Sequence, residues 1–359
     1  MDLNIIGIMF KVGKVLALTP QSQDNQKSNN FQKLYAIVVF LLCTVCFVMN
    51  MSYRTLFYDD LSSVQLLLFV FTDVDRYLHN VYTLIIVMIF KQKEWFKLIT
   101  NLRKTCVKAS KTSQLLTFVM SHAAFLVLFV FVFHISVRSL GFAIGIQLYF
   151  LEYIQFYCQF YYMLFSCIIL KMLLLRYSYQ KFLLHEEIKM IQKRSFYRNS
   201  KSLKKIQCNI FCLKESADIF SDIFGGSILL NIFFNALKSL IYLERIIKNG
   251  YLGGMSIVSL GQIGIMVFFW TGTIVTVLRC DAVLKKFVEI LRLSMKLEVI
   301  SSDMTKDKND QIRSFIDVVL HNRPKFTAFR FFEVNRSTIF RILYSIVTFL
   351  IIMIQFKLN

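Results

Sequence analysis

Apolar residues dominate several stretches of this chain, and most of these stretches are long enough to form a membrane-spanning helix. A helix needs about 20 residues to cross the hydrocarbon core of a bilayer. Six stretches meet this requirement, and they are 34–53, 63–90, 115–137, 146–170, 252–278 and 337–356. A seventh, 223–243, is mostly apolar although Asn231, Asn235 and Lys238 interrupt it. The pattern predicts an all-α membrane protein with seven transmembrane helices.

The segments between these stretches differ in length. One set is short, namely 54–62, 138–145 and 244–251, whereas 171–222 and 279–336 are long. In the long segments apolar residues recur every three or four positions, which is typical of helices. We therefore expect helical extensions on one side of the membrane, and no separate ligand-binding domain on the other.

The distribution of Lys and Arg predicts the orientation. When segments are assigned to alternate sides, 34 of these residues fall on the side of residues 1–33 and 5 fall on the opposite side. Basic residues concentrate in cytoplasmic loops. The N-terminus is thus expected in the cytoplasm and the C-terminus outside the cell, in a multi-pass protein of the plasma membrane. The net charge of +20 then reflects topology, and nucleic acid is not an expected partner.

We divide the chain into four parts on this basis. They are a cytoplasmic tail (1–33), a six-helix transmembrane ligand-binding bundle (34–278), a cytoplasmic anchor segment (279–336) and a last transmembrane helix (337–356). Within the tail, the apolar residues Ile5, Ile6, Met9, Phe10 and Val12 are spaced as in an amphipathic helix lying on the membrane surface. A frayed tail is the alternative.

The second span carries charged residues, which are costly inside a membrane. Asp73 and Arg76 are three residues apart, and Asp75 and His79 are four apart, so each pair can be neutralised on one helix. The alternative is a polar cavity open to the outside. The triplet Asp75-Arg76-Tyr77 is similar to one in G-protein-coupled receptors, where it ends the third span, but here it lies in the middle of the second.

The fourth span combines a polar stripe with an aromatic one. Glu152, Gln155, Gln159 and Tyr162 share one face, and Tyr149, Tyr153, Phe156 and Phe160 lie beside them. Polar groups among aromatic rings are typical of small-molecule pockets, although a packing seam between helices gives the same pattern. Our candidate ligand-binding residues are Asp73, His79, Glu152, Tyr153, Gln155, Gln159 and Gln262. The sequence contains no HExxH, GxSxG or paired His/Cys motif, so we expect no enzyme activity, metal or cofactor.

The last span also has a polar row. Thr338, Arg341, Ser345, Thr348, Ile352 and Gln355 fall on one helix face. This row can form one wall of a water-filled pore that several subunits share, or it can face neighbouring helices within one bundle. The pattern alone favours neither arrangement.

The C-terminal residues carry a family resemblance. The segment "TFLIIMIQF", Thr348 to Phe356, resembles the TYhhhhhQF signature of insect gustatory receptors (h is hydrophobic), with Phe349 in place of Tyr. Upstream, "FFEVNRSTIF" resembles the FFxxNRSLLF-like segment of the same family. The resemblance implies a tetramer of seven-helix subunits whose last helices line a central cation pore. It assigns Thr348, Ile352, Gln355 and Phe356 to the pore and gate.

This resemblance predicts a gustatory receptor that acts as a tastant-gated, non-selective cation channel. Its partners would be a small-molecule tastant, the lipid bilayer and other subunits in a homo- or hetero-tetramer. A G-protein-coupled chemoreceptor is one alternative, and the inverted topology argues against it. A transporter is another, and the lack of an internal repeat argues against that.

Overall fold

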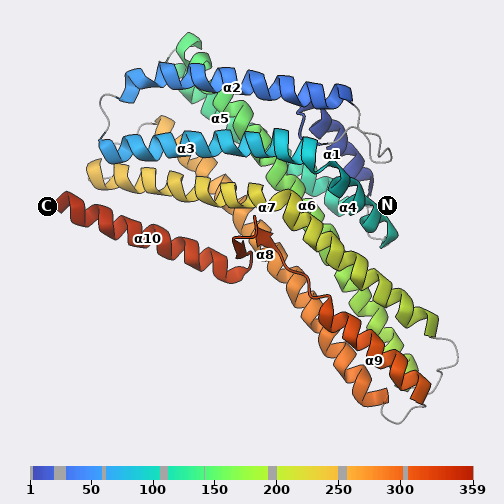
Figure 1. Ribbon diagram of the computed structural model, residues 1–359. Coiled ribbons are helices and arrows are strands. Elements are labelled where there is room, and N and C mark those ends of the chain that lie inside the picture. The colour runs from blue at the N-terminus through green and yellow to red at the C-terminus, as the bar shows by residue number, and fades with distance from the viewer. Residues whose placement is uncertain are drawn as a thin grey trace.

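The computed structural model describes residues 3–19, 30–58, 62–105, 112–140, 142–192, 200–249, 257–301 and 306–358. It is almost entirely helical (Figure 1). The elements in chain order are α1 (Leu3–Val15), α2 (Asn30–Tyr58), α3 (Ser63–Val81), the π-helix η1 (Tyr82–Phe90), α4 (Gln92–Lys104), α5 (Thr112–Leu140), α6 (Phe142–Gln192), α7 (Ser200–Asn249), α8 (Ile257–Ser301), α9 (Lys306–His321), the strands β1 (Thr327–Ala328) and β2 (Phe332–Glu333), and α10 (Arg336–Leu358).

Each of the seven apolar stretches lies on a helical part of the chain. They correspond to α2, α3 with η1, α5, α6, α7, α8 and α10, and only residues 252–256 fall outside the described residues. Five of the described helices are long and apolar enough to cross a membrane, namely α2, α5, α6, α7 and α8. The predicted all-α, multi-pass architecture is confirmed.

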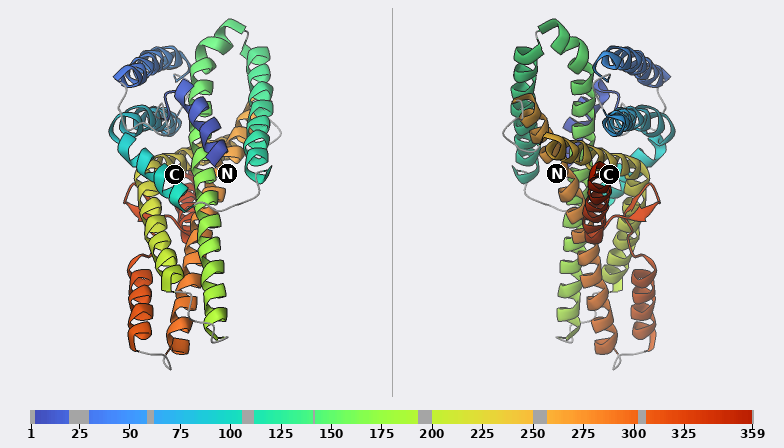
Figure 2. Two further views of the ribbon diagram at one scale, coloured as in Figure 1. Left: turned by 90° about the vertical axis from the view of Figure 1, so that its right-hand side faces the viewer. Right: turned by 90° about the vertical axis from the view of Figure 1, so that its left-hand side faces the viewer.

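Three helices are far longer than a membrane span. α6 has 51 residues, α7 has 50 and α8 has 45, and all three continue beyond the transmembrane bundle into a stalk that α9 completes (Figures 1 and 2). Across the stalk, Lys181 pairs with Glu289 at 2.6 Å, and Asn209 donates to Gln180 at 3.2 Å.

The boundary expected at residue 278 therefore falls inside a continuous helix. No proline or glycine follows Gly272 until after α8 ends, so nothing in the local sequence stops the helix there. The expected anchor segment, 279–336, supplies only part of the stalk. The rest comes from the end of α6 and the beginning of α7, which the sequence had assigned to the ligand-binding bundle.

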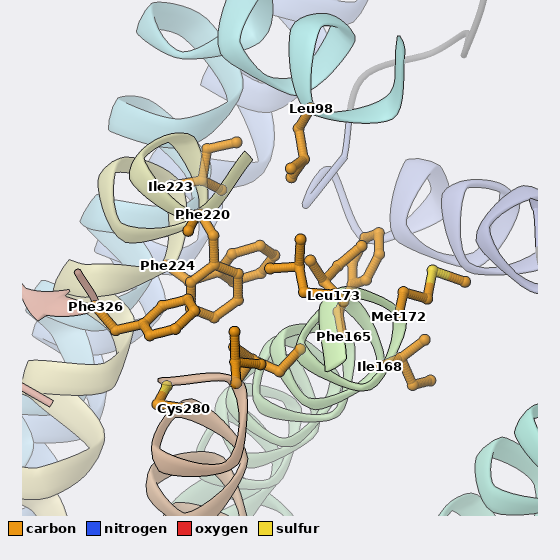
Figure 3. Close-up of a cluster of buried hydrophobic side chains, with 14 of the residues drawn as sticks. Leu98, Phe165, Ile168, Met172, Leu173, Phe220, Ile223, Phe224, Cys280 and Phe326 are labelled. Atoms are coloured by element: carbon orange, nitrogen blue, oxygen red, sulfur yellow. The ribbon is translucent and has the colours of Figure 1, made fainter. Parts of the chain in front are cut away.

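Aromatic side chains fill the junction between bundle and stalk. Phe165 of α6, Phe220 and Phe224 of α7, and Phe326 before β1 converge there, close to Cys280 of α8 (Figure 3). The rings of Phe220 and Phe224 stack with centroids 4.9 Å apart, and Phe326 meets Phe220 edge-on at 5.7 Å. This core joins the two parts firmly, because each aromatic ring buries a large apolar area.

The N-terminal helix packs into this core. In α1 the apolar residues Ile5, Ile6, Met9 and Phe10 are buried, and the ring of Phe10 lies 5.5 Å from that of Trp95. The spacing of an amphipathic helix is present, but its apolar face meets α4 and α6 rather than lipid. The prediction that this face lies on the membrane surface is therefore wrong. The local sequence of the tail does not reveal that α4 and α6 offer an aromatic surface to it.

A short β-hairpin connects the stalk to α10 and lies against the middle of α7. β1 and β2 are antiparallel, and a Cβ atom added at Gly225 of α7 would lie 2.7 Å from the Thr327 carbonyl oxygen. Arg330 at the hairpin tip pairs with Asp222 at 3.1 Å. The hairpin backbone thus approaches α7 as closely as a glycine allows.

The junction of α3 and η1 contacts the same part of α7. The Tyr82 hydroxyl lies 3.0 Å from the Ile223 carbonyl oxygen and accepts a hydrogen bond from the Gly226 N–H at 3.3 Å. A π-helix is uncommon and often marks a functional position. Here it begins where α3, α7 and the hairpin that leads into α10 come together.

Candidate functional site

Four charged side chains form a closed ion-pair ring between α2, α3 and α6. Arg54 pairs with Asp73 at 2.8 Å and with Glu152 at 2.6 Å. Arg76 pairs with the same two carboxylates. The side chains of Asp73, Arg76 and Glu152 are only 4–5% exposed. Each carboxylate therefore has two cationic partners, which offsets much of the cost of burying it.

The periodicity of α3 explains how its charges reach this position. The buried residues of α3 occur once or twice in each helical turn and are Gln65, Leu68, Thr72, Asp73, Asp75, Arg76, His79 and Asn80. This spacing turns one polar face of the helix toward the protein interior. α3 therefore presents its charges to α2 and α6 and its apolar residues to the outside.

The two charge pairs considered from the sequence have different outcomes. Asp73 and Arg76 do pair with each other. His79 instead contacts the Ser227 hydroxyl of α7 at 2.8 Å. Asp75 is buried, and its Oδ2 has no hydrogen-bond partner among the described residues. Asp73 and Arg76 are thus paired both with each other and with charged residues on α2 and α6, whereas Asp75 has no ion pair in the described part of the chain.

A small cavity lies beside the ring. Its polar lining includes Glu152, Lys238 of α7 and Gln262 of α8, and its aromatic walls include Tyr153 and Phe156. Its volume is about 10 Å³, which is room for about one water molecule. A larger ligand can enter only if the lining side chains move.

Lys238 is the unusual member of this lining. It is 7% exposed, and among the residues that the structure describes it makes no ion pair. Its ammonium lies 5.9 Å from the centroid of the Phe234 ring. Nearby, Tyr242 donates to the side-chain oxygen of Gln262 at 3.1 Å. A cation, a carboxylate and an amide thus share one aromatic cavity.

Six of the seven ligand-binding candidates fall into three groups in this geometry. Glu152, Tyr153 and Gln262 line the cavity. Asp73 lies behind it in the ion-pair ring. His79 and Gln159 lie apart from the lining, and Gln159 donates to Asn231 at 2.6 Å.

Gln155, the remaining candidate, is buried but does not line the cavity, and its Nε2 has no partner in the described part of the chain. The sequence reasoning missed Arg54, Lys238 and Tyr242. Lys238 had a signal, since a lysine interrupts an apolar span there. Arg54 had none, because it was assigned to an outer connection.

The polar row of α10 has a different environment. Thr348, Ile352 and Gln355 are exposed, as are Arg341 and Ser345; the side chain of Phe356 lies outside the described residues. α10 packs on α7 through Ile346, which joins a small cluster with Leu240 and Ile241. The row therefore does not face its own bundle, which was one of the two arrangements left open by the sequence.

Thr338 is the exception in this row. It is 5% exposed, and its hydroxyl donates to the Glu333 carbonyl at 3.1 Å while accepting from the Asn335 N–H at 3.2 Å. The residue fixes the start of α10 to the hairpin instead of continuing the exposed row. Its role is that of a helix-start residue.

Comparison with known proteins identifies the family. A family model described as "7tm Chemosensory receptor" matches residues 6–359. The chain belongs to this chemosensory receptor family. The receptor assignment agrees with the expectation that the protein is not an enzyme.

Two solved structures of an insect olfactory receptor have the same fold. The insect olfactory receptor OR5 from Machilis hrabei is 14% identical to this receptor, with a TM-score of 0.71 and 98% of each chain covered. The same protein in complex with eugenol is 15% identical, with a TM-score of 0.68 and coverage of 98% of this chain and 97% of that one. No curated protein sequence matches significantly. At this identity the likeness establishes the fold alone.

Proposed function

We propose that this receptor is a gustatory receptor that works as a tastant-gated, non-selective cation channel in the plasma membrane. Four subunits would form it, with the N-termini inside the cell and a central pore lined by the α10 helices. The observation that carries this proposal is the exposed polar row on α10, which includes Thr348 and Gln355.

The argument for a pore rests on the cost of placing polar groups in lipid. Buried polar side chains need a hydrogen-bond partner or water. In the described part of this subunit, the side chains of Thr348 and Gln355 have no such partner, and Ser345 bonds only to the Arg341 carbonyl of its own helix. Water in a shared pore, together with neighbouring subunits, would supply the partners.

α7 offers a direct mechanical link between the cavity and the pore helix. Lys238 and Tyr242 of α7 line the cavity, whereas Leu240 and Ile241 between them contact Ile346 of α10. A ligand that displaces the first pair would therefore shift the second. We propose this as the gating step, with Gln355 and Phe356 at or beside the gate.

The cavity is our candidate for the tastant site. It lies within the helix bundle, as small-molecule sites among helices commonly do. The OR5 structure with eugenol supports the idea that this fold accommodates a small molecule. The ligand of this receptor would contact Glu152, Tyr153 and Gln262, with Asp73 holding Glu152 in place through the shared arginines.

The test is whole-cell current recording from cells that express the chain, with G-protein signalling blocked, across sugars and plant alkaloids. A rapid cation current supports the channel proposal. A response that disappears under the block supports the metabotropic alternative, and flux at a fixed substrate stoichiometry supports a transporter. An epitope at the N-terminus that is accessible from outside would contradict the proposed orientation.

A further inference from the structure

The charge balance around the cavity points to the chemical class of the ligand. Arg54, Arg76 and Lys238 carry three positive charges, while the ring carboxylates Asp73 and Glu152 carry two negative charges. Both oxygens of Glu152 are already engaged by the two arginines. Glu152 therefore has no free oxygen for Lys238, whose ammonium is the positive charge in excess among these five side chains.

Lys238 is in a position to bind a ligand. It is more than nine-tenths buried and lines the cavity, and within the described residues it has no ion-pair or hydrogen-bond partner. Asp75, another carboxyl of α3, neither lines the cavity nor pairs with a cation in the described part of the chain. The Glu152 carboxylate attracts this ammonium across the cavity, but it is already bound by two arginines. A buried ammonium without an ion pair of its own is costly, so an incoming anion would be favoured there.

The other lining residues indicate what the uncharged part of such a ligand should be. Tyr153, Phe156 and Phe234 provide aromatic walls, and Met266 adds a flexible thioether that can move to admit a ring. The Gln262 side-chain oxygen accepts from Tyr242, so its NH₂ group remains a second donor for a carboxylate.

We propose that the cavity binds a small organic acid in its anionic form, with the carboxylate on Lys238 and an apolar or aromatic body among the rings. The inference rests on the proposed ligand site and deepens it by naming the ligand class. Neutral and cationic compounds of the same shape are disfavoured because neither neutralises Lys238, and a cation adds repulsion.

Three probes of matched shape test this: benzoate, benzyl alcohol and benzylamine. Their binding to the full-length receptor in lipid nanodiscs is measured by the shift in the thermal unfolding midpoint. Benzoate should raise this midpoint by about 2 °C at several times its Kd, and the other two should raise it less. An equal or larger shift with benzyl alcohol or benzylamine, or no shift with benzoate, overturns the inference.

Variants assign the effect to one side chain. K238Q should weaken benzoate binding by about 10-fold or more, because it removes a charge-assisted hydrogen bond, and K238R should retain most of the affinity. K97Q, on an exposed lysine of α4, is the control that removes a charge elsewhere. Unchanged benzoate affinity in K238Q overturns the assignment.

The binding measurement needs no ion current, so the two proposals fail separately. Benzoate binding through Lys238 without any evoked current would contradict the channel proposal alone. A ligand-evoked current without preference for the acid would contradict the ligand class alone.

Discussion

α3 and α10 are both apolar helices that carry charged and polar residues, yet these residues are buried in α3 and mostly exposed in α10. In α3 the residues Asp73, Arg76 and His79 are buried and find partners on α2, α6 and α7. In α10 the residues Thr348 and Gln355 are exposed. Polar residues in a membrane helix therefore identify a helix with a special environment, but they do not say whether that environment is inside the subunit or beyond it.

The largest expected effect tests the closed ring on α3. Arg76→Met leaves two buried carboxylates with one cation between them, so we expect a loss of about 3–5 kcal/mol in the free energy of unfolding. Denaturant unfolding of the receptor in nanodiscs measures it. Adding Asp73→Asn should recover much of the loss, since the charge is balanced again.

Arg341→Met on α10 is the matched control for Arg76→Met. Arg341 is exposed and has no ion pair in the described part of the chain, so subunit stability should fall by less than about 1 kcal/mol. Equal losses at Arg76 and Arg341 would contradict the contrast between the two helices.

The second prediction concerns the contact between α7 and the hairpin that leads to α10. Gly225→Ala places a Cβ atom 2.7 Å from the Thr327 oxygen and 2.9 Å from the Phe329 nitrogen, and backbone atoms cannot rotate away. We expect a cost of about 1–3 kcal/mol and an altered agonist dose–response curve. Thermal unfolding and current recording measure the two effects.

Gly272→Ala provides the comparison for Gly225→Ala. Its added Cβ meets the flexible end of the Met163 side chain, which can adopt another rotamer. This variant should therefore be the milder of the two. The reverse order would show that the hairpin is not held tightly against α7.

The third prediction tests a neutral polar contact between α6 and α7. Gln159→Leu removes the 2.6 Å hydrogen bond to Asn231 and leaves a buried acceptor unpaired, at a cost of about 1–2 kcal/mol. Adding Asn231→Leu should recover part of it. Additive losses in this double-mutant cycle would mean that the two side chains are not coupled.

The smallest effect on stability is expected in the polar row of α10, where function should change instead. Thr348→Cys should alter subunit stability by less than about 0.5 kcal/mol, but a water-soluble thiol reagent should reduce its current. Val347→Cys, about 100° away around the helix, should react less. The unsubstituted receptor, with eight cysteines, is the baseline, and equal inhibition of the two variants would argue against a pore-facing row.

The helix content of this fold was readable from the sequence, because hydrophobic length and helical periodicity are local properties. The Asp73–Arg76 pair was predictable for the same reason, because a spacing of three residues on one helix brings the two side chains close together. Local patterns could not predict that Arg54 reaches inward from the end of α2 to Asp73 and Glu152. That contact depends on how helices distant in the sequence pack together.

The candidate site was predictable to a similar degree. Glu152, Tyr153 and Gln262 line the cavity. They could be predicted because polar residues among aromatic ones indicate a helix face that points to the protein interior. His79 and Gln159 carry the same signal but have partners of their own on α7. Which interior polar residues remain available to a ligand is decided by neighbours on other helices, and the sequence pattern of one helix does not contain that information.

The unbroken course of α8 from the bundle into the stalk constrains how this protein can change in length. One inserted residue in the middle of the helix would rotate everything beyond it by about 100° relative to everything before it. The faces of α8 that meet α6 in the bundle and α9 in the stalk would then fall out of phase. Insertions and deletions should accumulate in the connecting loops, whereas inside α8 only steps close to whole turns, such as 7 or 11 residues, would preserve both interfaces.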